Sequence, residues 1–363
     1  MDKQENFTVA PENLRKENPR QDKKQIYVDT INKIIDSSSE HNFWIKNVSL
    51  SQNGSLIKLN YENIMDFYNM NFSLTSNPDK QSLDYHRQEQ NINNLLNNNT
   101  LNKKEYSANS FKTNNDILSL IFDINREETT RQANVIVDAI KKSIPENLNE
   151  IEKIKFLSDY LRFSFRYDTD FFNYAASTGS DCSYKIKDGI VNGSNSPSND
   201  ASQQQISEIN TALVCNNGVC REISFIFNGL CINNGIKSDC VECNYNNIRH
   251  IINLVTLSDG TKSFVDVTRI IRGDLNIENC FLVDRETLED HGYDFNNTKV
   301  DQSDILEVND RQIKTKTILN REEITNLEQS PPYNIKEIIL SVVKTKKENN
   351  CYLNPVEEEL VKS

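Results

Sequence analysis

A cysteine placed at the start of a predicted helix is the feature that most constrains how this chain folds. Cys220 closes the run Gly218–Val219–Cys220, and Ile223, Ile226, Phe227 and Leu230 then recur at helical spacing. Asn234–Gly235 supplies a helix stop, because glycine adopts the left-handed conformation that ends many helices. The segment therefore predicts a loop and then a helix whose first turn carries a thiol.

Two strand-like runs follow that helix, and each carries one polar residue of chemical interest. His250 lies in the run 249–253, and Asp266 lies in the run 264–268. The segment between them contains Asp259–Gly260, which is typical of a hairpin turn. The order predicts an antiparallel pair of strands with the histidine on one and the aspartate on the other.

The length of this hairpin loop decides whether His250 and Asp266 can meet. A two-residue loop would make the two side chains project from opposite faces of the sheet. A three-residue loop, with Gly260 in the left-handed region, pairs Leu257 with Thr261 and puts both side chains on one face. Diagonal neighbours of this kind are roughly 7–8 Å apart, which an imidazole and a carboxylate can bridge. A catalytic interpretation therefore requires the three-residue loop.

A cysteine, a histidine and an aspartate in this order can form a nucleophilic triad. The thiolate is the reactive form, and both a helix N-terminus and a histidinium neighbour favour it. His250 would accept the thiol proton and later donate it to a leaving amine, while Asp266 would orient the imidazole. The backbone N–H of Cys220 is one candidate oxyanion donor, and the side chain of Asn216 or Asn217 is a candidate second donor.

This part of the chain, residues 145–295, resembles the core of the transglutaminase-like superfamily, and bacterial members above all. The resemblance is carried by Gly218–Val219–Cys220 with its helix, by His250 with Asn253, and by Asp266–Val267–Thr268. It implies an α+β protein with a papain-like core, in which the catalytic helix packs on an antiparallel sheet. It also implies that Cys220, His250 and Asp266 are the catalytic residues. Family members often read His-Ala-Trp-Asn, whereas Ile251 and Ile252 stand between His250 and Asn253 here.

Charge and hydropathy restrict the partners of the chain. The formal net charge is -12 and no Lys/Arg-rich block stands out, so we expect no nucleic acid and no membrane partner. A protein or peptide substrate is the expected partner, and no cofactor is expected. The first residues lack the apolar segment of a signal peptide, which predicts a cytoplasmic location with non-classical export left open. The eight irregularly spaced cysteines favour reduced thiols.

A second cysteine pattern, Cys240–Val241–Glu242–Cys243, invites comparison with a zinc site. Cys231 and Cys280 could complete four ligands, but no second CxxC and no paired histidines follow. The segment is also typical of a strand, which would point its two thiols to opposite faces. We therefore expect no metal.

Composition and periodicity divide the chain into four parts. We expect a disordered N-terminus (1–25), an N-terminal extension containing helix, β-hairpin and Asn-rich linker (26–116), a catalytic domain (117–298) and a C-terminal extension (299–363). Asn53–Gly54 predicts the hairpin. Ser143–Ile144–Pro145–Glu146 is typical of a capping box that opens a helix, and the polar segment 177–210 indicates a long loop.

Two functions from different classes fit these observations. The first is cysteine-dependent acyl transfer on a glutamine carboxamide or peptide carbonyl through a thioester, with a transglutaminase, deamidase or peptidase outcome. The second is a non-catalytic protein-binding module on the same scaffold. Taken singly, each residue has an ordinary structural explanation: a buried thiol, a core histidine and a helix-capping aspartate. The catalytic interpretation depends on the three being close in space.

Overall fold

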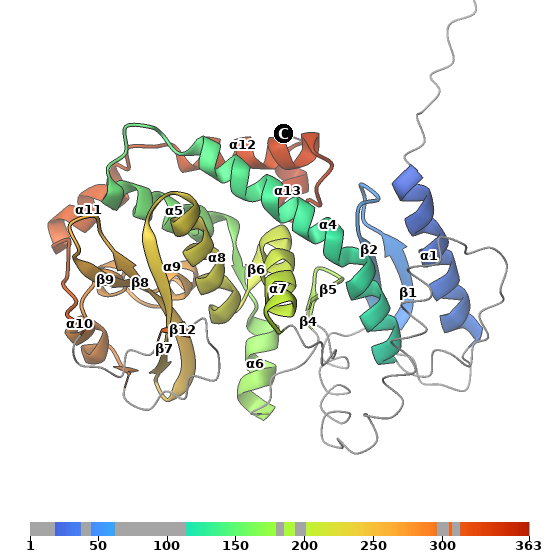
Figure 1. Ribbon diagram of the computed structural model, residues 1–363, viewed down its shortest axis with the longest axis horizontal. Coiled ribbons are helices and arrows are strands. Elements are labelled where there is room, and N and C mark those ends of the chain that lie inside the picture. Colours follow the sequence, from blue (N-terminus) through green and yellow to red (C-terminus); the bar gives the residue numbers. More distant parts are fainter. Residues whose placement is uncertain are drawn as a thin grey trace, which may run out of the picture.

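The computed structural model describes residues 19–37, 45–61, 114–178, 185–192, 201–295, 305–306 and 313–362. These residues form a mixed α and β structure with an antiparallel sheet and several helices, which agrees with the expected α+β class at this level. In Figure 1 the sheet lies at one end of the molecule, and helix α1 with the β1–β2 hairpin lies at the other. The long helix α4 lies between these two ends.

The main sheet carries the residues of chemical interest. Its strand order is β10–β9–β8–β7–β11, and β12 pairs in parallel with β7. The strands are β7 (Lys237–Tyr245), β8 (Ile248–Thr256), β9 (Lys262–Val265), β10 (Phe281–Val283), β11 (Tyr293–Asp294) and β12 (Ile305–Leu306). Because β7, β8 and β9 are consecutive antiparallel neighbours, one hairpin loop sets the register between His250 and Asp266.

That hairpin has the three-residue loop that the sequence interpretation requires. The backbone N–H of Leu257 donates to the carbonyl of Thr261 at 2.8 Å, and Gly260 has a φ of 86°. Leu254 pairs with Phe264 further along, in the same register. The prediction of a three-residue loop is therefore confirmed, and it brings the histidine and the aspartate to the same face.

The helices pack around this sheet and extend away from it. They are α1 (Pro19–Ser37), α4 (Asn114–Ser143), α5 (Glu150–Ser164), α6 (Thr169–Thr178), α7 (Ala201–Cys215), α8 (Cys220–Asn233), α9 (Val267–Arg272), the 3-10 helix η3 (Ile277–Asn279), α10 (Arg285–Asp290), α11 (Arg321–Gln329), α12 (Ile335–Glu348) and α13 (Pro355–Leu360). Helix α8 begins at Cys220 and ends at the predicted Asn234–Gly235 stop, where Gly235 has a φ of 77°. Short strand pairs join the helices: β1 (Ile45–Leu50) with β2 (Ile57–Tyr61), β3 (Arg166–Tyr167) with β6 (Asn217–Gly218), and β4 (Lys185–Lys187) with β5 (Ile190–Asn192).

Helix α4 contributes to two separate buried clusters. Its first part, including Ile117 and Ile121, packs with the apolar residues of α1 and the β1–β2 hairpin. Its second part, including Ile136 and Ile140, belongs to the main core with α5 and α8. The N-terminal hairpin and the main core are thus connected through one continuous helix.

Several local expectations need correction. Helix α1 begins at Pro19, inside the segment expected to be disordered. The capping box lies at Asn149 and Glu152, not at 143–146, because α4 runs on to Ser143. Within 177–210, part of the expected loop is regular: β4 and β5 occupy 185–192, and α7 begins at Ala201.

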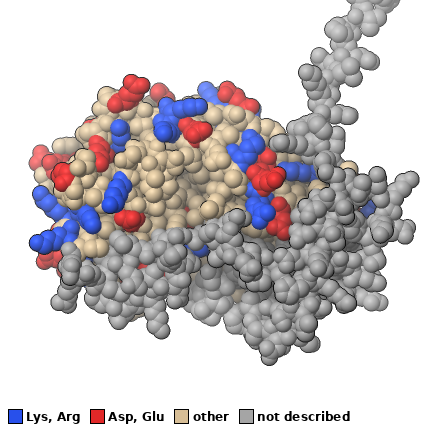
Figure 2. All heavy atoms as spheres, in the orientation of Figure 1, with Lys and Arg blue, Asp and Glu red and all other residues tan. Residues whose placement is uncertain are grey.

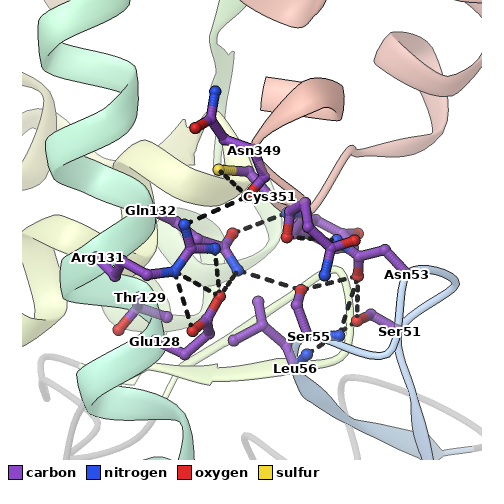
Figure 3. A network of polar contacts seen from close by, with 12 residues as sticks. Ser51, Asn53, Ser55, Leu56, Glu128, Thr129, Arg131, Gln132, Asn349 and Cys351 are labelled. Carbon is purple, nitrogen blue, oxygen red and sulfur yellow. Dashed lines mark hydrogen bonds and ion pairs between the residues drawn. The ribbon is translucent and has the colours of Figure 1, made fainter. Parts of the chain in front are cut away.

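The β1–β2 hairpin is confirmed, and a polar network connects its loop to two distant parts of the chain (Figure 3). The Asn53 side chain donates to the carbonyl of Asn350 at 3.0 Å. Gln132 of α4 donates to Ser55 Oγ at 3.1 Å and accepts from the backbone N–H of Tyr352 at 2.8 Å. The network joins the N-terminal hairpin, α4 and the segment before α13, so residues near both ends of the chain pack together.

The described surface carries charges of both signs. On the face drawn in Figure 2, lysine and arginine side chains are interspersed with aspartate and glutamate. Within the described ranges, no helix has the length and apolar character needed to cross a membrane.

Candidate active site

Cys220 occupies the first position of α8, at the end of a short strand. Just before it, β6 pairs in parallel with β3, and Tyr167 pairs with Gly218. A Cβ added at Gly218 would lie 3.1 Å from Glu222 Cβ, which explains the glycine two residues before the thiol. The Glu222 carboxylate accepts the backbone N–H of Val219 at 2.9 Å and so closes the helix start. Cys220 is half-buried, whereas the other six described cysteines are buried.

Two hydrogen bonds fix α8 onto strand β8. Ser224 Oγ donates to the carbonyl of Ile251 at 2.7 Å, and Asn253 Nδ2 donates to the carbonyl of Ser224 at 3.0 Å. Both bonds are buried and lie one turn beyond Cys220. They hold the start of the helix next to the part of β8 that carries His250.

His250 and Asp266 are in direct contact. Nε2 of His250 lies 2.6 Å from Oδ2 of Asp266, with 6% of the histidine side chain and none of the aspartate side chain exposed. Because Nε2 faces the carboxylate, Nδ1 is the ring nitrogen left for another partner. The Cys220 side chain is near the same ring and adds, after Asp266, to the rise in its pKa. The structure therefore brings together all three residues predicted from the sequence.

The Asp266 carboxylate is held by two further partners. Its Oδ1 accepts the backbone N–H of Arg269 at 3.1 Å as the N-cap of α9, and the hydroxyl of Tyr293 donates to Oδ2 at 2.7 Å. Sequence reasoning did not identify Tyr293. Its strand β11 pairs with β7, and the sequence gives no local signal for that long-range pairing.

These contacts keep the pair charged at neutral pH. Burial raises the pKa of Asp266, but the His250 charge and the hydrogen bonds from His250, Tyr293 and Arg269 outweigh it and lower that pKa overall. Burial lowers the pKa of His250, but the Asp266 charge and hydrogen bond, together with Cys220, raise it to about 10. A histidinium beside a sulfur favours the thiolate over the thiol.

The charge on His250 predicts a pH-dependent stability. We expect the free energy of unfolding of Cys220→Ala to exceed that of Cys220→Ala/His250→Gln. The difference should be largest below about pH 6.5, where the histidine of the unfolded chain is also protonated. The part of this difference that comes from the histidine charge should shrink as the pH rises above this value and be lost above the raised folded pKa. In the Cys220→Ala background the folded pKa of His250 lies below about 10, because Cys220 contributes to raising it in the wild type. Urea unfolding of both variants at several pH values between roughly 5 and 10 measures the difference in the free energy of unfolding. A difference that does not change with pH would contradict the charged pair.

Removing the hydroxyl of Tyr293 tests how the aspartate is held. Tyr293→Phe deletes one hydrogen bond to a buried charge, so the free energy of unfolding should fall by about 1.5–3 kcal/mol. Tyr245→Phe is the matched control, since its ring packs against Tyr293 with centroids 4.8 Å apart. Thermal or urea unfolding of the two variants should show a clearly larger loss for Tyr293→Phe, and equal losses would argue against the contact.

Aromatic and cationic side chains surround the three residues. The Tyr245 ring lies 6.2 Å from the His250 ring, and Arg269 stacks on Tyr245 at 3.6 Å. Tyr167 lies near Cys220: burial and the Cys220 charge raise its pKa, and Arg272 stacks on its ring at 4.7 Å. Next to these rings the imidazole is buried, and the sulfur stays partly accessible.

Of the candidate second oxyanion donors, Asn216 is already occupied. Its Nδ2 donates to Glu357 Oε1 at 2.9 Å, and the residue is buried. This contact uses one N–H of the Asn216 amide and holds the amide toward Glu357, which favours the side chain of Asn217 as the second candidate donor, in addition to the backbone N–H of Cys220.

The two thiols of the CxxC pattern differ in their relation to this site: Cys243 pairs with His250 across β7 and β8 and borders the site, whereas Cys240 pairs with Asn253 further along the same strands. Cys240 and Cys243 are both buried on β7 and belong to different clusters, as expected for thiols on opposite faces. In the part of the chain that the structure describes, no three His, Cys, Asp or Glu side chains group as metal ligands. His291 ends α10, with Nδ1 2.7 Å from the carbonyl of Thr287.

Comparison of the sequence with protein-family models gave no match, and comparison with curated proteins gave none either.

Proposed function

We propose that this protein is a cysteine acyl-transfer enzyme of the transglutaminase-like class, with Cys220 as nucleophile. The observation that carries the proposal is the 2.6 Å contact between His250 and a fully buried Asp266, with Cys220 near the same ring at the start of α8. Burying an ionised carboxylate is costly unless it is paired and hydrogen-bonded. A structural role for the three residues would not require the only half-buried thiol among the described cysteines to lie there.

The arrangement supports a two-step reaction. The Cys220 thiolate attacks the carbonyl carbon of an amide, and the developing oxyanion accepts the backbone N–H of Cys220. His250 donates its proton to the leaving ammonia or amine, which leaves a thioester on the sulfur. In the second step His250 accepts a proton from water or an incoming amine as that nucleophile attacks the thioester. The acid or new amide departs and the thiolate–imidazolium pair is restored, with Asp266 stabilising the charged ring throughout.

The order and packing of the elements support a papain-like core. Helix α8 begins at the thiol and packs on an antiparallel sheet, and two adjacent strands of that sheet lead to His250 and Asp266. Asn253 connects the helix to the histidine strand. Ile251 and Ile252, which replace the usual Ala-Trp pair, are buried, so the departure changes the packing next to the site rather than the three residues themselves.

The substrate class follows from the chemistry of the thioester. A protein or peptide that presents a glutamine carboxamide or a peptide carbonyl to the half-buried sulfur fits the proposed reaction. The product separates the outcomes: water on a glutamine thioester gives deamidation, an amine gives cross-linking, and attack on the main chain gives cleavage.

The test is incubation of the wild type with glutamine-containing peptides, with and without a primary amine, followed by mass spectrometry. We expect deamidated, amine-linked or cleaved peptides from the wild type and unmodified peptides from Cys220→Ala. His250→Gln should also be inactive, while His291→Gln, at the end of α10, is the matched histidine control that stays active.

A binding module on the same scaffold predicts a different result. In that case no peptide is modified, and iodoacetamide labels Cys220 no faster in the wild type than in His250→Gln. The comparison with His250→Gln is needed because Cys220 is also the most accessible of the described cysteines, so fast labelling alone could reflect exposure.

A further inference from the structure

A buried ion pair near the C-terminus contacts the segment that leads into Cys220. Nζ of Lys346 lies 2.6 Å from both carboxylate oxygens of Glu357, and the two side chains are 1% and 5% exposed. Lys346 is on α12 and Glu357 is on α13. The carboxylate also accepts the backbone N–H of Asn354 at 2.9 Å and the Asn216 side chain at 2.9 Å. Asn216 is the junction between α7 and β6, four residues before the thiol.

The backbone at Asn216 has an uncommon conformation and starts a strand pairing. Its φ is 51°, in the left-handed region that side chains other than asparagine and aspartate rarely adopt. Its carbonyl accepts the backbone N–H of Arg166 at 2.9 Å, which starts the β3–β6 pairing. The carbonyl of Gly218 accepts the N–H of Asp168 at 3.0 Å and completes that pairing. A change at Asn216 is therefore transmitted along β6 to the first turn of α8.

Stability alone is a weak reason for a buried pair at this place. Replacing a buried ion pair by apolar residues of similar size is often neutral or stabilising, because desolvation offsets the attraction. A carboxylate in that position does something an apolar side chain does not: it accepts the Asn216 amide and so holds the side chain of the residue that forms the turn. Lys346 keeps the carboxylate in place and also donates to the carbonyl of Val214 at 3.3 Å.

We propose that Glu357 is a positioning residue for Cys220: helix α13 delivers its carboxylate, Lys346 fixes it, and it holds the Asn216 turn from which the nucleophile's strand starts. The C-terminal segment 346–357 is thus part of what makes the thiol reactive, although it contributes no atom to the reaction. The part of the proposal that concerns the reactivity of Cys220 rests on the proposed function. The part that concerns the structure of the Asn216 turn rests on the fold alone.

Two double variants that differ only at position 357 test the proposal in the full chain. Lys346→Met/Glu357→Gln removes both charges but keeps an oxygen that can accept the Asn216 amide. Lys346→Met/Glu357→Leu removes that acceptor as well. Both are expected to fold, because each replaces the ion pair by uncharged side chains. Circular dichroism and thermal unfolding establish that the pair is matched.

The two readouts are iodoacetamide labelling of Cys220 and hydrogen exchange of the peptide spanning 213–223. We expect the Leu variant to label at least about tenfold more slowly than the Gln variant, since small misplacements of a reacting group have effects of this size. Its 213–223 peptide should also exchange faster. Equal labelling and equal exchange in the two variants would overturn the proposal.

A third variant approaches the same contact from its other end. Asn216→Gly allows the positive φ but deletes the amide, so it should behave like the Leu variant. Asn350→Gly is the matched control, because Asn350 also has a positive φ of 53° and lies between Lys346 and Glu357 in the sequence. If wild-type Cys220 labels no faster than in His250→Gln, the proposed function fails, but hydrogen exchange of 213–223 still decides whether Glu357 holds the turn.

Discussion

Replacing Cys220 by serine is expected to abolish acyl transfer and to lower turnover by at least about 10³-fold. The reason lies in the protonation state of the neighbouring ring. The Asp266 charge and hydrogen bond, which contribute most to raising the pKa of His250, remain in the serine variant, and a ring that is held protonated cannot remove a proton from a serine hydroxyl. A thiol beside the same imidazolium ionises far more readily, since its ordinary pKa is much lower than that of a hydroxyl.

The serine variant should fold normally, because oxygen for sulfur at a half-buried position changes little volume. Turnover is measured with the peptide shown to be modified by the wild type, and circular dichroism with thermal unfolding provides the control. A serine variant that keeps a tenth or more of the wild-type rate would contradict the role of the sulfur as the nucleophile.

Asp266→Asn is expected to lower turnover by about 10⁴-fold, the effect seen when a triad aspartate loses its charge. The amide can keep the α9 cap at Arg269, but it removes the negative charge that holds His250 protonated. Burial, which lowers the pKa of His250, is then opposed only by the smaller effect of Cys220, so this pKa should fall well below its wild-type value.

The matched control is Asp274→Asn, at a surface aspartate that pairs with Arg269 and Arg272 at 2.7 Å each. This variant should stay within a few-fold of the wild type, because exposed pairs contribute little. Steady-state kinetics of both variants at one pH measure the contrast. Similar losses in the two would mean that charge near α9, and not the contact with His250, determines activity.

The sequence predicted the centre of the candidate site because local rules determine it. The Cys220 helix follows from apolar periodicity and the Asn234–Gly235 stop. The contact between His250 and Asp266 follows from one hairpin loop, because the length of that loop sets the register of the two strands. The β1–β2 hairpin followed in the same way from Asn53–Gly54.

The supporting residues could not be predicted, because each depends on a contact between distant segments. Tyr293 reaches Asp266 through the β11–β7 pairing, and Glu357 reaches Asn216 across 141 residues. The capping box at 143–146 was misplaced because several residues near the end of α4 fit the same short pattern, and the length of α4 decided between them. The domain boundaries stay a prediction. The Asn-rich segment 91–99 lies outside the described residues.

The most direct measurement of the central claim is the titration of the His250 ring by NMR. The chain has only four histidines, so the ring signals can be assigned by comparison with His250→Gln. We expect His250 to stay protonated through neutral pH and to titrate near its raised pKa of about 10. A ring that titrates near the ordinary value of about 6.5 would contradict the charged pair, and with it the enzyme proposed on it.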